Sequence, residues 1–197
     1  MIELCFRNIK VCFRFSFFAA VALLMLCSGS SYAVYSFYAC LLHESGHLAV
    51  MLLFGQPVKK LVFYGAGIKI IRPRNDLLNQ YGREFCIVCS GCAVNFVIYA
   101  LTAVFPCTAA LREFGEANLA VGMFNFLPLS FLDGGKAIIL MFFRLFSYET
   151  AERLEKILKW VNIITVPAAA VILFIVGLRN FTVYVTLIFL LFTSVMM

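Results

Sequence analysis

Long runs of apolar residues without a charged side chain recur from one end of this sequence to the other. Hydrophobic residues make up 63% of the 197 residues, and charged residues only 13%. A helix needs about 20 apolar residues to cross the ~30 Å hydrocarbon core of a bilayer, and several runs approach or exceed that length. The composition is too apolar for a soluble domain, so the sequence predicts an all-α polytopic membrane protein.

About six transmembrane helices are expected. They are predicted at 13–27, 33–54, 85–105, 117–146, 158–178 and from 181 to the C-terminus. For the first run a cleaved signal peptide is the alternative, because Ser31-Tyr32-Ala33 looks like a cleavage site. Apart from these spans we expect no soluble domain, so the chain is predicted to be a single membrane domain over 1–197.

A basic segment after the second span has a different pattern. Residues 58–73 alternate β-branched, aromatic and basic side chains around Gly65-Ala66-Gly67. This pattern predicts a short membrane-associated β-hairpin that is too charged to span the bilayer. The 61–71 hairpin offers an edge on which an extended substrate could add a strand, and a purely structural hairpin is the alternative.

The distribution of Lys and Arg predicts the orientation. Basic residues gather in the N-terminal tail, in 55–84 and in 144–159, whereas the loops between them hold one each, Arg112 and Arg179. By the positive-inside rule the basic segments are cytoplasmic, and so are both termini. The net charge of +6 therefore reflects membrane topology, and nucleic acid is not an expected partner.

The chemically most specific motif is His43-Glu44-Ser45-Gly46-His47, which lies inside the second span and contains both histidines of the chain. Residues four apart share a helix face, so the two imidazoles can bind one Zn²⁺ while Glu44 reaches a water on the metal. A catalytic zinc takes three protein ligands. Among the ten acidic residues only Glu44 and Asp133 lie deep within apolar runs, so Asp133 is the predicted third ligand.

The surroundings of Asp133 predict a broken helix. Pro128 and Gly134-Gly135 interrupt the fourth apolar run near 125–135, and such a break is tolerated in a bilayer only against protein or a watery cavity. Lys136 follows Asp133 by three residues and either orients the site or reaches toward the headgroups.

Three of the eight cysteines recur every three residues along one predicted helix, at Cys86, Cys89 and Cys92. They could form a thiolate metal site. The pattern favours the alternative, in which they are small side chains at a place where helices pack closely. No second CxxC pair lies elsewhere in the chain to support a thiolate metal site.

Taken together, these motifs resemble the site-2 protease family of intramembrane zinc metalloproteases. The resemblance rests on His43-Glu-Ser-Gly-His47, on Gly91 and Asn95 in the next span, and on Asn125-x-x-Pro128-x-x-x-Leu132-Asp133-Gly134-Gly135. The layout looks most like the stage IV sporulation FB-type branch, without a PDZ insertion or the CBS domain usual in that branch, over a core of about 33–146. Two positions depart from the family: Cys92 and Phe131 stand where proline is usual.

The resemblance implies a role for each residue. His43, His47 and Asp133 would bind zinc, Glu44 would be the catalytic acid/base, and Asn125 would lie near the substrate. Either Asn125 or Asn95 could stabilise an oxyanion, and a structural hydrogen bond to a neighbouring backbone is the alternative for both.

The predicted function is therefore a zinc metalloendopeptidase in the bacterial cell or forespore membrane. Its substrate would be a membrane-bound or membrane-tethered protein cut near the cytoplasmic face, such as a pro-sigma factor or a signalling regulator, and other membrane proteins could regulate it. A metal-binding membrane transporter and a catalytically silent membrane adaptor are the alternatives. A transporter would need ligands leading across the bilayer, and an adaptor would not need Glu44.

Overall fold

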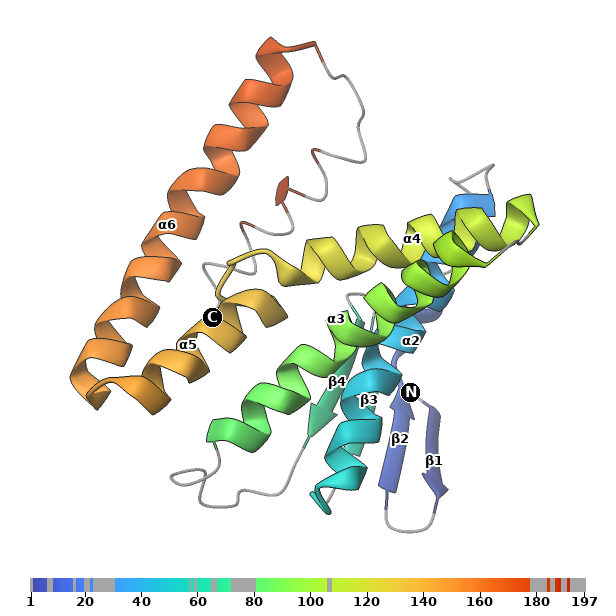
Figure 1. The fold of residues 1–197 in the computed structure, drawn as a ribbon, viewed down its shortest axis with the longest axis horizontal. Coiled ribbons are helices and arrows are strands. Elements are labelled where there is room, and N and C mark those ends of the chain that lie inside the picture. Colours follow the sequence, from blue (N-terminus) through green and yellow to red (C-terminus); the bar gives the residue numbers. More distant parts are fainter. Residues whose placement is uncertain are drawn as a thin grey trace. The chain divides into compact units, whose positions relative to one another are not determined.

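The computed structural model (Figure 1) divides into two compact units, Met1–Phe124 and Asn125–Met197. The residues that the structure describes are 2–6, 9–15, 17–19, 22, 31–56, 58, 60–64, 67–71, 81–105, 108–177, 184, 187–188 and 191. Most of the predicted last span and about half of the predicted first span lie outside the described residues.

The first unit contains a four-stranded sheet in the order β1-β2-β3-β4. Its strands are β1 (Ile2–Phe6), β2 (Ile9–Phe13), β3 (Lys60–Tyr64) and β4 (Gly67–Ile71). The β1–β2 and β3–β4 pairs are antiparallel, whereas β2 and β3 run parallel. The predicted 61–71 hairpin is confirmed as β3–β4, and so is a mostly helical chain.

The sheet is nevertheless larger than the single hairpin expected from the sequence. The N-terminal residues, read as a basic tail and the beginning of a span, form the two further strands, because apolar and polar residues alternate in them as a half-buried strand requires. Since β2 pairs with β3, the outer edge of the hairpin is β4.

A polar side-chain cluster joins three of these strands. The Cys12 thiol donates to Glu3 Oε1 at 3.3 Å, and Lys60 Nζ lies 3.5 Å from the same oxygen. The hydrogen bond from Cys12 and the charge of Lys60 together lower the pKa of Glu3. On the other face, the Phe13 and Phe63 rings stack with centroids 4.5 Å apart, so β2 and β3 are tied together on both faces.

Two long helices of this unit, α2 (Ser31–Leu53) and α3 (Tyr81–Val104), pack against one another (Figure 1). A Cβ added at Gly46 of α2 would lie 2.8 Å from Ser90 O of α3, so the glycine of the HExxH motif permits the close approach. Met51, Val58 and Ile87 form a small buried core at this pair of helices, and Leu61 of β3 packs against it.

Helix α4 (Ala109–Phe126) begins earlier than the predicted fourth span. Its first turns carry Glu113 and Glu116, which accept hydrogen bonds from Ser31 (2.9 Å) and Tyr32 (3.1 Å) at the start of α2. These hydrogen bonds give partners to two carboxylates in a segment that the hydropathy pattern assigns to a loop but that is helical in the structure.

The second unit begins with the expected interruption of the helix. Helix α4 ends at Phe126, and α5 (Asp133–Leu145) begins after residues 127–132. A Cβ added at Gly134 would lie 2.7 Å from Leu127 O, and one at Gly135 would lie 2.9 Å from Ser130 Cα. The two glycines therefore let the connecting segment fold back against the first turn of α5.

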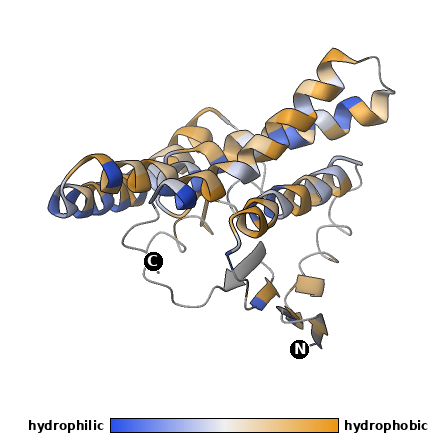
Figure 2. Cartoon of the chain, turned by 60° about the horizontal axis from the view of Figure 1, so that its bottom comes forward, coloured by the Kyte–Doolittle hydropathy of each residue, from blue (hydrophilic) through white to orange (hydrophobic). Residues whose placement is uncertain are grey.

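Helix α6 (Tyr148–Ile175) packs against α5 and includes most of the basic 144–159 segment. Among the described residues, α3 and α6 are long and apolar enough to cross a membrane, by length and composition alone. The helices are apolar over most of their length (Figure 2), and large side chains of α6 such as Trp160 and Ile164 are exposed. Such a surface fits contact with lipid, and the number of six spans stays a prediction.

Candidate metal centre

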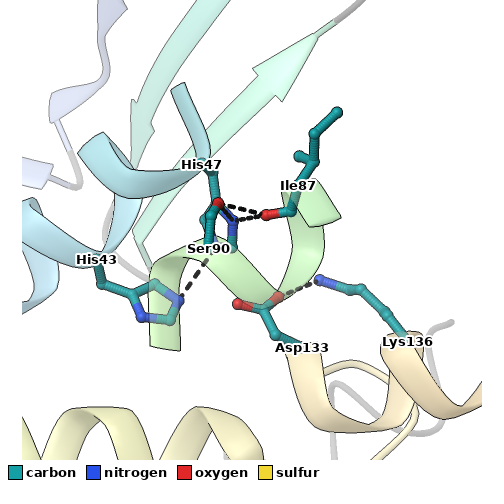
Figure 3. Close-up of polar contacts among 6 residues, drawn as sticks. All are labelled: His43, His47, Ile87, Ser90, Asp133 and Lys136. Carbon is teal, nitrogen blue, oxygen red and sulfur yellow. Dashed lines mark hydrogen bonds and ion pairs between the residues drawn. The ribbon is translucent and has the colours of Figure 1, made fainter. Parts of the chain in front are cut away.

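Two buried imidazoles face one another on one side of α2 (Figure 3). His43 and His47 are one helical turn apart, and their Nε2 atoms are 3.2 Å apart. Two nitrogens that bind one tetrahedral zinc at about 2.0–2.1 Å lie about 3.3 Å from each other. The spacing of the two nitrogens therefore fits a shared metal ion.

The opposite nitrogen of each ring is held by an oxygen of α3. His47 Nδ1 lies 2.6 Å from Ile87 O, and His43 Nδ1 lies 2.8 Å from Asn95 Oδ1. Carbonyl oxygens only accept, so both Nδ1 atoms carry the hydrogen and, in the neutral rings, both Nε2 lone pairs face each other. Only a cation between them, a metal ion or a proton, makes that arrangement favourable, and outer hydrogen bonds of this kind are typical of metal-binding histidines.

Gly91 of α3 lies directly against the two rings. A Cβ added there would lie 2.5 Å from His47 Nε2 and 2.7 Å from His43 Nε2. Because glycine has no side chain, no atom from this position occupies the space beside both nitrogens. A side chain at this position would compete with the metal itself.

Asn95 is fully buried and belongs to a side-chain network. Its Nδ2 donates to Ala39 O at 3.1 Å and to Asn118 Oδ1 at 2.8 Å, while Asn118 donates to Phe114 O at 2.8 Å. Both N–H groups of Asn95 therefore have acceptors within the protein. These contacts favour a role in orienting His43 over a role in binding an oxyanion.

Glu44 follows His43 on α2 and is half-buried. Asn125 lies in the last turn of α4 and is also half-buried. The structure thus brings together His43, His47 and Asn95 within the first unit, whereas Asn125 and Asp133 belong to the second.

Asp133 is the first residue of α5, directly after the break in the helix. Lys136 Nζ lies 3.3 Å from Asp133 Oδ1 (Figure 3), so the lysine pairs with the carboxylate rather than pointing away from it. Of the two roles considered for Lys136, this contact fits the orienting one.

Two polar residues in these surroundings were not singled out from the sequence. Asn118 continues the Asn95 network, and Asn162 of α6 donates to Ser130 Oγ at 3.0 Å in the segment before Asp133. Asn162 is fully buried, and its Oδ1 has no hydrogen-bond partner among the described residues. Asparagines within apolar helices were the available signal, but nothing in their spacing showed which partners they contact.

One sequence relative and one solved structure relate the chain to known proteins. No family model matches the sequence. Stage IV sporulation protein FB of Bacillus subtilis is 29% identical over 122 residues, which cover 58% of this chain and 41% of that protein. The match thus spans less than half the length of this relative.

The fold is similar to that of a site-2 protease from Methanocaldococcus jannaschii, with a TM-score of 0.67 and 19% identity. That similarity covers 98% of this chain and 93% of the archaeal chain. Together the two similarities confirm the resemblance to the site-2 protease family that the motifs indicate.

Proposed function

We propose that this chain, which has the fold of a site-2 protease, is an intramembrane zinc metalloendopeptidase. The observation that carries the proposal is the pair of buried His43 and His47 Nε2 atoms 3.2 Å apart, with each Nδ1 held from behind by α3. A histidine pair prepared in this way on the helix that also carries Glu44 is the arrangement of a zinc peptidase.

In this proposal His43, His47 and Asp133 hold the zinc. When bound, zinc lowers the pKa of a coordinated water to about 7 and polarises the substrate carbonyl. Lys136 orients the Asp133 carboxylate through their ion pair. Glu44 accepts the proton that the attacking water loses and passes it to the leaving amine.

Asn125 is the candidate for contact with the substrate or its oxyanion. It lies one residue before the end of α4, where the helix gives way to the segment that leads to Asp133. Helix ends next to irregular backbone are where a membrane enzyme can offer polar groups to an extended peptide. Asn95, whose amide hydrogens are engaged, is assigned to positioning instead.

The substrate class follows from the setting of the site. A protease built from apolar helices meets membrane-bound or membrane-tethered proteins, and an extended segment of such a protein can add to the sheet at β4. No strand pairs with the outer side of β4 in the part of the chain that the structure describes. Resemblance to the sporulation branch points to a pro-sigma factor with a membrane-associating prosequence, and next to a membrane-anchored signalling regulator.

The test is proteolysis by the purified full chain in detergent or vesicles, with a membrane-tethered candidate substrate and zinc analysis of every variant. Glu44→Gln should retain zinc and lose cleavage, because the amide keeps the shape of the carboxylate but cannot accept a proton. Asp133→Ala should lose zinc as well as activity, since it removes a proposed ligand. Glu113→Gln makes the same chemical change as Glu44→Gln outside the site and should leave cleavage intact.

Cleavage that persists in Glu44→Gln would contradict the proposed mechanism. Asp133→Ala with full zinc content would show that the third ligand lies elsewhere. Zinc uptake into vesicles by a wild-type protein that cleaves no membrane substrate would favour a transporter instead.

A further inference from the structure

Cys92 belongs to the surroundings of the histidine pair. Its Sγ lies within 4.8 Å of a ring nitrogen of His43, and the residue is 4% exposed. It directly follows Gly91, where an added Cβ would lie against both imidazoles. The other two cysteines of this helix differ, because Cys86 is exposed and Cys89 is half-buried.

Thiolate sulfur is among the strongest protein ligands for zinc, with a bond length of about 2.3 Å. A sulfur and a nitrogen on one tetrahedral zinc lie about 3.6 Å apart. Cys92 Sγ, within 4.8 Å of a His43 nitrogen, lies close to that separation. Two imidazoles and one thiol thus offer three metal-binding atoms from α2 and α3 alone.

We infer that Cys92 is a metal ligand in the resting protein, at the position that a catalytic site keeps for water. The inference rests on the proposed function, because it assumes the same metal at His43 and His47. In the binding step a metal–sulfur bond forms, the bound water leaves, and the thiol proton passes to solvent. A zinc closed by four protein ligands holds no water for catalysis, so the thiolate must leave before a peptide bond is cut.

Cobalt provides a direct test, because Co²⁺ bound to a thiolate has an intense charge-transfer absorption in the near ultraviolet and Co²⁺ bound to nitrogen and oxygen alone does not. The full chain is loaded with one equivalent of Co²⁺, and metal content is measured on the same samples. We expect the charge-transfer band in the wild type, complete loss of the band in Cys92→Ser, and an unchanged band in Cys89→Ser. His47→Ala should lose the cobalt and the band together.

A second readout is the cleavage rate of the zinc-loaded protein. Cys92→Ala should cleave a membrane-tethered substrate severalfold faster than the wild type, because it removes the competitor of the water. Circular dichroism checks that each variant keeps its helical content.

The outcomes separate the two proposals. Cobalt that is bound stoichiometrically and depends on His47, but shows no thiolate band, overturns the role of Cys92 and leaves the metal centre standing. A band that survives in Cys92→Ser also overturns it, since another cysteine then supplies the sulfur. A wild type that binds neither cobalt nor zinc overturns the metal centre and the inference together.

Discussion

Gly91 determines, at the scale of single residues, whether there is room for an ion. Gly91→Ala should abolish zinc binding, because the added methyl group would lie 2.5 to 2.7 Å from the two Nε2 atoms that would bind the metal. Zinc content and helicity, measured on purified protein, check this expectation. Gly115→Ala is the matched control, since its Cβ would press on Thr102 away from the histidines. Full zinc occupancy in Gly91→Ala would show that the ion binds on another side of the rings.

Asn95 allows its two possible roles to be separated by measurement. If it orients His43, Asn95→Ala should weaken zinc binding by about 10- to 100-fold, as is typical for partners of metal-binding histidines. Asn95→Asp should recover only part of that loss, because a carboxylate oxygen still accepts from His43 Nδ1 but the donors to Ala39 O and Asn118 Oδ1 are lost. Competition with a zinc chelator measures both affinities. Unchanged zinc affinity with a reduced turnover would instead support the oxyanion role.

The histidine pair could be identified from the sequence because its geometry is local. His43 and His47 are one helical turn apart on one helix, so their shared face follows from helix geometry alone. The contacts of Ile87, Asn95 and Asn118 arise between helices, and their partners depend on how α2, α3 and α4 pack. Spacing within one segment carries no information about such packing.

At the scale of elements, the outer edge of β4 is where the strand-addition hypothesis can be tested. In an antiparallel pair, alternate N–H groups point toward the partner strand and away from it. The hairpin closes at the Tyr64–Gly67 pair, so the N–H of Ile70, opposite Leu61, points outward. Ile70→Pro should therefore reduce cleavage severalfold without changing zinc content, because it removes one edge donor and spares the pairing with β3.

Ile70→Ala retains the N–H and serves as the control, so it should cleave nearly as well as the wild type. Val62→Pro is not an equivalent test, because Val62 lies on the interior strand β3 and is buried. Normal processing by Ile70→Pro would make the hairpin a scaffold rather than a substrate platform.

The elements show where sequence patterns were sufficient. Pro128 and the paired glycines predicted the break between α4 and α5, and alternation around a glycine-rich turn predicted β3–β4. The strands β1 and β2 were not predicted. Their basic residues suggested a cytoplasmic tail, and the apolar run that follows suggested the beginning of a span. Parallel pairing of β2 with β3 joins segments far apart in the chain, which no local pattern reveals.

At the scale of the whole molecule, the positive-inside rule makes a prediction about topology. Ser147 lies within the basic 144–159 segment and Thr108 lies in a segment between spans, and both are exposed. In a background without native cysteines, Ser147→Cys should react with a membrane-impermeant thiol reagent only after the cells are opened. Thr108→Cys should react in intact cells. Labelling of Ser147→Cys from outside would reverse the predicted orientation.

The parallel pairing of β2 with β3 has a consequence for stability that reaches the histidines. It closes the intervening chain, which contains α2, into a loop held at both ends by one sheet. An ion that orders α2 therefore reduces the conformational entropy that is lost when β2 pairs with β3. In turn, pairing of the two strands reduces the entropy that is lost when α2 becomes ordered. Zinc should accordingly slow hydrogen exchange at the amides of Val11 and Leu61, although neither residue touches the metal centre. The N-terminal strands thus hold both ends of the loop that contains α2, and removing them should weaken zinc binding although they do not contact the proposed site.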